Sequence, residues 1–367
     1  MIYKAIGLMS GSSLDGLDIA YVHFQETGGK WSFEIIHSIC YEYPAEWVEK
    51  LRNATTLSAL DYLLLHVDYG HYTGKLVNGF IDTFGLHHKV DLVASHGHTS
   101  FHIPSKKLTA QLGDGAAIAA VTGLPVIADL RSMDLALGGE GAPIVPAGEK
   151  LLFQDYDLLL NLGGIANITF KLSNEYAAFD SCAANCVLNT LAGLAGKAFD
   201  ENGEMGARGY VNPLLLQELN SIEYYGKPYP KSLSNDFGTD VIIPLILRYN
   251  LTVNDSLCTY VEHIAMQVQA AIASVVQAGG GLLAPLRLLV TGGGVFNLFL
   301  TERIRSLLEF LNIETIVPAN ELVNYKEAVI MALLGVLRWR EEYTVFSSVT
   351  GATRNTIGGA LWLGVDA

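Results

Sequence analysis

Three glycine-rich turns, each directly after an apolar segment, are the parts of this chain best suited to bind an anion. They span residues 7–18, 161–167 and 291–297. Glycine lets backbone N–H groups approach an anion closely because no Cβ stands in the way. Any one of them could be an ordinary hairpin or helix start, but three in one chain, two of them in matching hairpin contexts, favour phosphate binding. None is a Walker loop or a G-x-G-x-x-G fingerprint.

The side chains around these turns suit phosphate and metal chemistry. Hydroxyl groups can donate to phosphate oxygens, and the carboxylates of Asp15 and Asp18 can face a metal ion directly or through water. The candidate cofactor-binding residues are Gly11, Ser12, Ser13, Asp15, Gly16, Asp18, Gly163, Gly164, Asn167, Gly292, Gly293, Gly294 and Asn297.

Two carboxylates are candidates for catalysis, although the residues alone favour structural roles for both. Asp180 follows the apolar residues 177–179 and precedes a predicted helix, so it could lie at a reaction cleft. Aspartate also commonly caps a helix, here one that starts near Ala183, and the local sequence favours the cap. Glu327 lies in the first turn of a predicted helix, where glutamate is ordinary.

A histidine cluster and a nearby ion pair are further candidates. His96 and His98 come at the end of a short predicted strand over 90–95, and His102 follows. Two histidines at this spacing could bind zinc, but no carboxylate or cysteine completes a familiar ligand set nearby, so we expect no metal there and favour a polar loop that faces a substrate. Arg131 and Asp134 could reach a substrate carboxylate, hold a hinge, or form a surface ion pair.

Seven short segments together carry a resemblance to one family. They are residues 7–18, 95–99, 112–114, 138–143, 161–167, 179–181 and 326–328. These segments are similar, in that order, to the patterns G-x-M-S-G-T-S-x-D-G-x-D, S-H-G-Q-T, L-G-D, G-G-Q-G-A-P, N-L-G-G-I-A-N, F-D-T and K-E-A. The patterns are those of the bacterial anhydro-N-acetylmuramic acid kinases, a branch of the sugar-kinase, Hsp70 and actin superfamily. The resemblance runs nearly from end to end.

The resemblance implies a fold, a reaction and roles for residues. The fold would be α/β, with two actin-like (ribonuclease H-like) domains, each a mixed sheet flanked by helices, and ATP in the cleft between them. The enzyme would open 1,6-anhydro-N-acetylmuramic acid with water and phosphorylate O6, using ATP and Mg²⁺, to give N-acetylmuramic acid 6-phosphate in cell-wall recycling. Asp180 would be the general base, and Glu327 would hold the sugar or assist the water. The candidate substrate residues are His96, His98, Arg131, Asp134, Glu140 and Asn185.

Four departures from the family patterns make the substrate less secure than the reaction class. Cys182 and Ala183 replace the Gly-Pro after F-D-T, and Asn189 replaces an aspartate. His98 and Glu140 each replace a glutamine. Two alternatives therefore stay open: a kinase of the same fold that acts on another sugar, and a non-catalytic actin-like protein that binds ATP.

The apolar pattern predicts elements that repeat in two halves. A strand, a glycine turn and a second strand open the chain over 3–24, and the same layout restarts over 157–172. Helical spacing predicts helices over 45–53, 58–84, 114–122, 184–196, 254–278, 297–311 and 327–340. We therefore expect domains over residues 1–135 and 136–367, with the last helix possibly packing back on the first domain.

Net charge and cysteine content limit which binding partners and which cellular compartment we expect for this chain. The chain has 367 residues and a net charge of −14, so it lacks the basic footprint of a nucleic-acid binder or of a protein that binds anionic lipid. Four cysteines without a C-x-x-C pair suit free thiols in a reducing compartment. We expect a cytoplasmic enzyme, without a signal peptide, whose partners are an amino sugar and ATP, with neither nucleic acid nor membrane; a homodimer is possible.

Overall fold

The computed structural model describes residues 1–11, 13–172, 175–229, 231–234, 236–278 and 285–364. The chain forms two compact units, residues 1–154 with 325–367, and residues 155–324. Each unit holds a mixed β-sheet flanked by helices, which confirms the α/β prediction.

The first unit is built on a seven-stranded sheet with the order β12-β6-β4-β1-β2-β3, and β5 pairs with β4. Strands β1, β2 and β3 form an antiparallel meander, whereas β4 runs parallel to β1 and β6 parallel to β4. The strands are β1 (Ile2–Ser10), β2 (Gly16–Thr27), β3 (Lys30–Glu42), β4 (Leu92–Ile103), β5 (Leu108–Leu112), β6 (Val126–Ala128) and β12 (Ala360–Trp362).

The second unit repeats this order in a five-stranded sheet, β11-β10-β7-β8-β9. An antiparallel meander of β7, β8 and β9 is again extended by two strands, β10 and β11, that run parallel to the first strand of the meander. The strands are β7 (Leu158–Leu162), β8 (Ile165–Leu172), β9 (Glu175–Ala183), β10 (Leu286–Thr291) and β11 (Ile313–Ile316). The repeat predicted from the sequence pattern is therefore confirmed as a repeat of topology.

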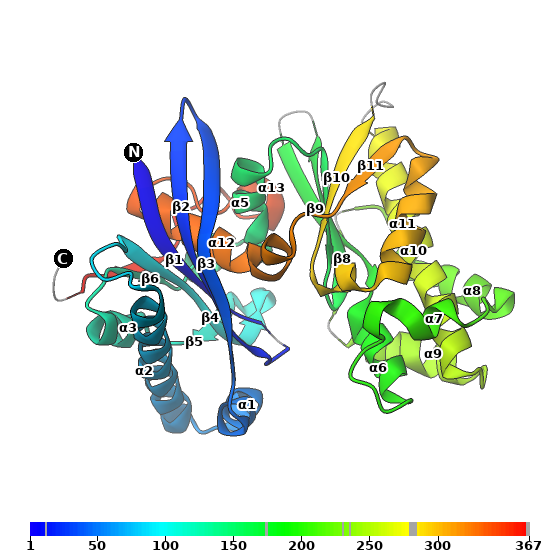
Figure 1. The fold of residues 1–367 in the computed structure, drawn as a ribbon, viewed down its shortest axis with the longest axis horizontal. Coiled ribbons are helices and arrows are strands. Elements are labelled where there is room, and N and C mark those ends of the chain that lie inside the picture. The colour runs from blue at the N-terminus through cyan, green and yellow to red at the C-terminus, as the bar shows by residue number, and fades with distance from the viewer. Residues whose placement is uncertain (12, 173–174, 230, 235, 279–284, 365–367) are drawn as a thin grey trace. The chain divides into compact units, whose positions relative to one another are not determined.

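Helices cover both faces of the first sheet (Figure 1). Ile6 and Leu8 of β1 belong to the core under α2 and α3, and the alternate position Gly7 meets α12 on the other face. A Cβ at Gly7 would lie 1.8 Å from the Ala328 carbonyl oxygen, so only glycine lets α12 pack this closely. The helices of this unit are α1 (Ala45–Arg52), α2 (Ala59–Phe84), α3 (Gly115–Thr122), α4 (Ser132–Ala136), α5 (Val145–Leu152), α12 (Asn320–Trp339), which begins in the second unit, and α13 (Ser347–Thr350).

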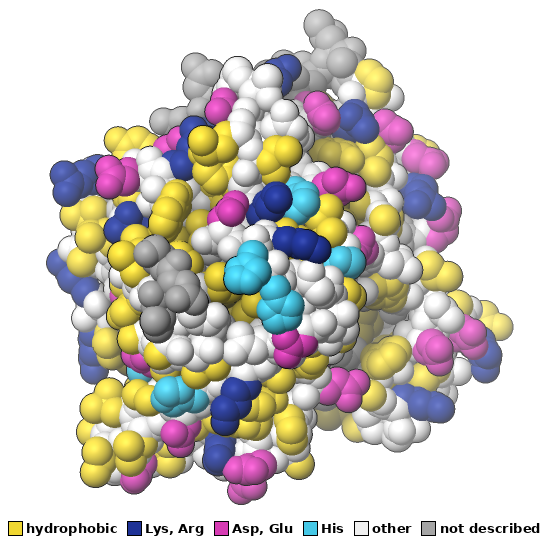
Figure 2. All heavy atoms as spheres, turned by 60° about the vertical axis from the view of Figure 1, so that its left-hand side comes forward, with side chains coloured by type: hydrophobic (Ala, Val, Ile, Leu, Met, Phe, Trp, Pro, Cys, Tyr) yellow, Lys and Arg dark blue, Asp and Glu magenta, His cyan; other side chains and the backbone are white. Residues whose placement is uncertain are grey.

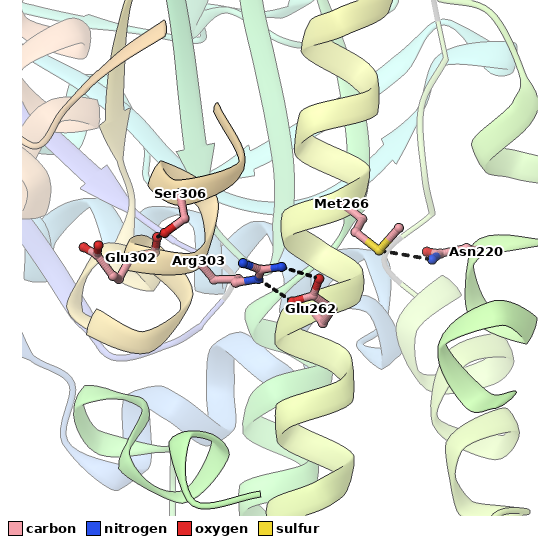
Figure 3. Close-up of polar contacts among 6 residues, drawn as sticks. All are labelled: Asn220, Glu262, Met266, Glu302, Arg303 and Ser306. Atoms are coloured by element: carbon pink, nitrogen blue, oxygen red, sulfur yellow. Dashed lines mark hydrogen bonds and ion pairs between the residues drawn. The ribbon is translucent and has the colours of Figure 1, made fainter. Parts of the chain in front are cut away.

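Two long helices of the second unit are tied to each other and to a third helix. Arg303 of α11 forms a two-pronged ion pair with Glu262 of α10, at 2.5 and 2.8 Å (Figure 3). Asn220, at the end of α8, donates to the Met266 sulfur of α10 at 3.5 Å. The helices are α6 (Asn185–Gly193), α7 (Glu204–Ala207), α8 (Pro213–Asn220), α9 (Ile243–Leu247), α10 (Val253–Ala278) and α11 (Leu298–Glu309).

Two expectations about the chain's layout differ from the structure. Residues 136–154, expected in the second domain, belong to the first unit, because α5 packs on β3 and α12; a Cβ at Gly148 would lie 2.6 Å from the Ile330 side chain. Most of the last predicted helix also belongs to the first unit, the arrangement that the sequence analysis had left open. The strand predicted over 90–95 was expected to stop at His96. This was wrong, since β4 continues to Ile103 by pairing with β5.

Two features bear on the expected partners: the distribution of charge on the surface, and the length and apolar character of the helices. On the face shown in Figure 2, Lys and Arg side chains lie interspersed with Asp and Glu rather than in one basic patch. None of the helices in the described ranges combines the length and apolar character needed to cross a membrane.

Candidate functional site

A buried hydrogen-bond chain fixes the start of the first glycine turn. Ser10, the last residue of β1, is 3% exposed, and its Oγ lies 3.0 Å from His98 Nδ1. The Tyr43 hydroxyl donates to Ser10 Oγ at 2.8 Å and also contacts the Tyr69 hydroxyl. Ser10 and His98 therefore share a buried hydrogen bond, and burial lowers the pKa of the His98 ring. His98 thereby holds the backbone that enters the turn, and its predicted substrate role stays a prediction.

The turn itself is tied to the neighbouring strand. The Tyr43 N–H donates to the Asp15 carbonyl at 3.2 Å, and the Leu14 N–H donates to Gly11 at 3.5 Å. A Cβ at Gly16 would lie 2.5 Å from the Tyr41 carbonyl oxygen, so this glycine is required by the close approach of β3. Ser13 is exposed, and Ser12 lies outside the described residues.

Asp18 has the electrostatic character of a cation site. Burial raises its pKa to about 6; its hydrogen bond with the Cys40 thiol opposes the rise, and the nearby charges of Glu327 and Asp15 add to it. A magnesium ion here would relieve the repulsion among these carboxylates, and carboxylate oxygen is the ligand it prefers. Asp18 is therefore the carboxylate of this turn that could hold Mg²⁺, and that role stays a prediction.

Arg131 is half-buried and connects β4 to the 138–141 turn. Its Nε donates to His96 Nε2 at 2.9 Å, and its Nη1 donates to the Gly141 carbonyl at 2.7 Å. His96 is therefore the neutral tautomer with Nδ1–H directed at the Gly97 carbonyl, 2.9 Å away, and burial lowers its pKa to about 3. Because Arg131 occupies Nε2, His96 has no nitrogen free for zinc. Within the described ranges, no group of three or more His, Cys, Asp and Glu residues is arranged to hold a metal ion.

The hydrogen-bond partners of Asp134 are those expected of a side chain that stabilises a turn. Its Oδ2 accepts from the Gly141 N–H at 2.8 Å, and its Oδ1 accepts from the Thr350 hydroxyl at 2.7 Å. It is 1% exposed, whereas Glu140 beside it is exposed, with its N–H bonded to the Thr350 carbonyl. The contacts of Asp134 favour positioning of the Gly138–Gly141 segment, and its predicted substrate role stays a prediction.

Glu327 lies on α12 in an unusually charged interior. Burial raises its pKa, and the positive charges of Lys326 and Arg131 oppose that rise. Lys326 pairs with Glu149 of α5 at 2.9 Å, both side chains being 4% exposed. The ion pair fixes the helix turn that carries Glu327.

In the second unit, the other two glycine turns lie side by side. Thr291, at the end of β10, pairs in register with Asn161 of β7, so both strands end at the same edge. Gly163 and Gly164 carbonyls accept from the first N–H groups of α6 at 2.8–3.3 Å, including that of Asn185 at 3.1 Å.

Asn185 and the third turn complete this edge. The Asn185 side chain donates to the Leu162 carbonyl at 2.9 Å. A Cβ at Gly294 would lie 2.7 Å from the Leu162 Cβ, and one at Gly292 would lie 2.5 Å from Asn161 Oδ1, whereas Gly293 is open, with nothing closer than 4.0 Å. Of the three glycines, Gly293 alone leaves room for a ligand.

The two candidate asparagines differ in role. Asn297 caps α11, because its side chain accepts from the Leu300 N–H at 2.9 Å. Asn167 lies opposite Asp180 in the β8–β9 register. Asn167 therefore borders the candidate base, and Asn297 shapes the third turn.

Asp180 lies within β9, and its position is fixed by a segment far along the chain. The Leu233 N–H donates to Asp180 Oδ2 at 2.9 Å, the Tyr224 hydroxyl donates to its carbonyl at 2.7 Å, and its own N–H donates to Lys231 at 3.1 Å. Burial raises its pKa, and the Leu233 N–H opposes this. The helix-cap interpretation was wrong, since the N-cap of α6 is Ala184 and no side chain caps it.

Comparisons with known proteins place this geometry in a family. Residues 3–364 match the family model described as anhydro-N-acetylmuramic acid kinase. The chain is 32% identical over 382 residues to the protein of that name from Pasteurella multocida, covering 97% of this chain and 96% of the relative. It is 33% identical over 380 residues to that from Haemophilus influenzae, with 97% of each covered. The chain belongs to the anhydro-N-acetylmuramic acid kinase family.

The chain also aligns with a solved structure, that of the activator of the 2-hydroxyisocaproyl-CoA dehydratase from Clostridium difficile with bound ADPNP. The alignment covers 92% of this chain and 97% of the activator chain. The sequence identity is 15% and the TM-score is 0.41.

Membership of this family of ATP-dependent sugar kinases confirms the resemblance. The structure gathers the candidates into two groups, each at the carboxyl ends of parallel strands, where α/β sheets bind ligands. Gly11, Asp18, His96 and His98 lie at the ends of β1 and β2 and along β4. The second group, around β7, β9 and β10, is Asn167, Gly163, Gly164, Asp180, Asn185 and Gly292–Gly294.

Sequence analysis missed several residues that position these groups. Tyr224 and Leu233 hold Asp180 from 44 and 53 residues away, and Tyr43 holds Ser10 from 33 residues away. No local pattern marks them, because their role arises only from contacts between distant segments. Tyr43 alone had a signal, as a tyrosine that ends a predicted strand.

Proposed function

We propose that this protein is an ATP-dependent kinase that opens 1,6-anhydro-N-acetylmuramic acid with water and phosphorylates O6. Water oxygen attacks the anomeric carbon and the C1–O6 bond breaks. O6 then forms a bond to the γ-phosphorus as the bond from that phosphorus to ADP breaks. The products are N-acetylmuramic acid 6-phosphate and ADP, and the proton from water is taken up by a base.

The observation that carries this proposal is the setting of Asp180. One carboxylate oxygen is held by the Leu233 N–H, and among the described residues the other has no hydrogen-bond partner. Its raised pKa makes it a better proton acceptor than an ordinary aspartate. It adjoins the glycine turns of its own unit, so the base and the phosphate-binding backbone share one edge of the sheet.

ATP is expected to use the glycine turns. Residues 10–18 and 161–167 hold the phosphates, with open positions such as Gly293 leaving room along the 291–297 turn for adenosine. Asp18 would hold Mg²⁺, with Asp15 nearby, and the ion supplies neutralisation of charge on the transferring phosphoryl group. The turns position backbone N–H donors. The buried hydrogen bonds of Ser10 with His98 and Tyr43 hold the end of β1, where the first turn begins.

The sugar is expected to meet charged and polar side chains among the candidate residues. Arg131 would bind its lactyl carboxylate, with Glu327 and Asn185 holding hydroxyl groups or the water. His96 and His98 act through Arg131 and Ser10, respectively, since their nitrogens already contact those residues. Glu140 is exposed and adds charge, and Asp134 holds the turn beside it.

The setting proposed for the enzyme is the cytoplasm, where its cysteines stay reduced. Its partners are the amino sugar and ATP, and a homodimer is possible. The four cysteines of the described chain are free, with Cys182 and Cys258 buried.

The test is ATP turnover with and without the anhydro sugar, run in ¹⁸O-labelled water. The sugar should stimulate ADP formation, and the label should appear on the C1 hydroxyl and not in phosphate. Labelled free phosphate without a phosphorylated sugar would mean simple ATP hydrolysis and would refute the proposal. Stimulation by a different amino sugar, and not by this one, would select a kinase of the same fold with another substrate, which Glu140 in place of glutamine favours. Binding of ATP without turnover on any sugar would select a non-catalytic protein.

A further inference from the structure

Helix α12 packs against α5 through two contacts that lie one helical turn apart on α12 (Figure 1). Lys326 of α12 pairs with Glu149 of α5, with 2.9 Å between Nζ and Oε1. A Cβ at Gly148 would lie 2.6 Å from the side chain of Ile330, so the two helices approach closely there as well. Residues four apart lie on one face of a helix, so Lys326 and Ile330 form the face of α12 that meets α5.

The opposite face of α12 packs on the first strand of the sheet. A Cβ at Gly7 of β1 would overlap the Ala328 carbonyl oxygen and would lie 2.7 Å from the Ala332 nitrogen. At about 100° of rotation per residue, this face lies about 200° round the helix from the face that meets α5, and Glu327 projects between the two. The packed faces therefore fix the direction of Glu327 and hold Lys326 beside it.

Stability alone does not explain a charged pair at this position. Both side chains are 4% exposed, and the second carboxylate oxygen of Glu149, Oε2, is buried without a hydrogen-bond partner among the described residues. Removal of two charges from water is costly, and apolar residues of similar volume in place of a buried ion pair are often neutral or stabilising. Lys326 and Glu149 carry this cost in an interface that already has close apolar contacts.

Glu327, unlike the ion pair, is only half-buried, so a ligand can reach it. Burial raises the pKa of Glu327; the charge of Lys326 opposes this rise most strongly, that of Arg131 also opposes it, and that of Glu149 adds to it. Asp18 lies near enough for its carboxylate and that of Glu327 to repel each other. Lys326 is thus the main positive charge that favours the ionised form of Glu327.

We propose that Lys326, held in place by Glu149, is a positioning residue that keeps Glu327 ionised. Its ammonium group cannot turn away, because it is bound by Glu149 and buried between α5 and α12. An ionised carboxylate accepts hydrogen bonds with both oxygens, whereas a protonated carboxyl group uses one oxygen as a donor. That the donors to Glu327 belong to the sugar or to the attacking water rests on the proposed function, whereas the ionisation of Glu327 does not.

Two double variants separate the charges of the pair from its contribution to packing. The exchanged variant, Lys326→Glu/Glu149→Lys, keeps an ion pair between α5 and α12 but reverses the charge beside Glu327. The double-methionine variant, Lys326→Met/Glu149→Met, keeps apolar bulk and removes both charges. The control is the same exchange in an exposed pair of α11, Arg305→Glu/Glu302→Arg, whose nitrogen and oxygen lie 2.7 Å apart.

The pKa of Glu327 is measured in the full chain by ¹³C NMR of the glutamate carboxyl groups, and its signal is assigned by its loss in Glu327→Gln. The pKa should rise from the parent to the double-methionine variant and rise further in the exchanged variant, because Lys326 outweighs Glu149 in its effect on Glu327. The surface control should leave it unchanged. The double-methionine variant should stay folded, as followed by circular dichroism.

Turnover gives a second readout, which a purely structural role would not move. The acidic limb of the kcat/KM profile for the anhydro sugar should move to higher pH in both double variants. Below the pKa, each unit of this movement corresponds to about a tenfold loss, and the loss should disappear at higher pH. A loss of packing alone would instead lower activity at every pH.

Three outcomes would overturn the proposal. They are an equal pKa of Glu327 in the parent and the exchanged variant, an equal or lower pKa in the double-methionine variant, and failure of the double-methionine variant to fold, since the charges would then be needed for the fold. If the exchanged variant does not fold, the double-methionine variant decides.

Failure of the proposed function would be distinguishable from failure of this proposal. Movement of the pKa without movement of the acidic limb would refute a role of Glu327 in turnover and leave its ionisation by Lys326 intact. A protein with no turnover on any sugar would refute the proposed function alone, because the NMR result does not depend on activity.

Discussion

Replacement of Asp180 by asparagine should remove the proton acceptor and little else. The amide oxygen of asparagine can still accept from the Leu233 N–H, which lies 2.9 Å from Asp180 Oδ2. The contacts made by the backbone of Asp180, to Tyr224 and Lys231, do not involve the side chain. Turnover with the anhydro sugar should therefore fall at least about a hundredfold, which corresponds to about 2.7 kcal/mol of transition-state stabilisation. ATP binding should be nearly unchanged.

Stability should separate asparagine from alanine at the same position. Burial raises the pKa of Asp180, so its ionised form is disfavoured in the folded state and the loss of charge does not destabilise the protein. Asp180→Asn should thus unfold at nearly the parent temperature. Asp180→Ala leaves the Leu233 N–H without its acceptor, and we expect a loss of about 1–2 kcal/mol because the amide is partly buried.

The assay couples ADP formation at saturating sugar to product analysis, with thermal unfolding followed by circular dichroism. The parent should also lose activity on the acidic side at a pKa above the ordinary 3.8 of aspartate, since the base must be ionised and burial raises its pKa. An Asp180→Asn variant that keeps more than a tenth of the parent turnover would refute the role of Asp180 as the base. So would equal losses of stability in the asparagine and alanine variants, since the Leu233 contact would then not be what holds the side chain.

Three further predictions concern the first unit, which contains all four tryptophans, so that tryptophan fluorescence reports its unfolding. Because burial raises the pKa of Asp18 from 3.8 to about 6, its charge weakens the folded state, and the parent should lose stability as the pH rises through this window. Asp18→Asn should escape that loss and gain about 1–2 kcal/mol on the parent between pH 4.5 and 7.5, from about 1.4 kcal/mol per pKa unit discounted for partial exposure; parallel pH profiles would contradict this. His98→Leu removes a hydrogen-bond partner of the buried Ser10 hydroxyl and should cost about 1–3 kcal/mol, whereas His98→Gln, which keeps a polar partner, should cost less in urea unfolding; equal costs would show that the Ser10 contact is unimportant. Gly16→Ala places a Cβ 2.5 Å from the Tyr41 carbonyl and should lower the free energy of unfolding by about 1–3 kcal/mol; an unchanged unfolding midpoint would mean that β3 yields freely.

The local sequence determined those features of the protein that depend only on residues close to one another along the chain. The apolar residues at the start of the chain predict a strand before the first glycine turn, and the structure has β1 there, paired with β2 and β4. The glycine turns follow strands in both halves, so the repeated topology could be expected before any contact was known. The segment 179–181 singled out Asp180 through its family pattern, although its chemistry alone favoured a helix cap.

Tertiary structure decided what depends on distant residues. The end of β4 was misplaced because its extension needs β5 as a partner, and hydrogen bonds to a partner strand are absent from a local pattern. His98 and Asp134 looked like substrate ligands, but contacts with Ser10 and Thr350, respectively, show what their polar atoms bind in the fold.

The same division holds for the candidate base and its surroundings. The sequence by itself determined that residue 180 is an aspartate downstream of a glycine turn that is a candidate for phosphate binding. The Leu233 N–H that orients its carboxylate and the Tyr224 hydroxyl that holds its carbonyl come from a segment more than 40 residues downstream, and burial raises its pKa. A pKa depends on burial and on nearby charges, and these are set when distant segments pack, so only the tertiary structure could decide them.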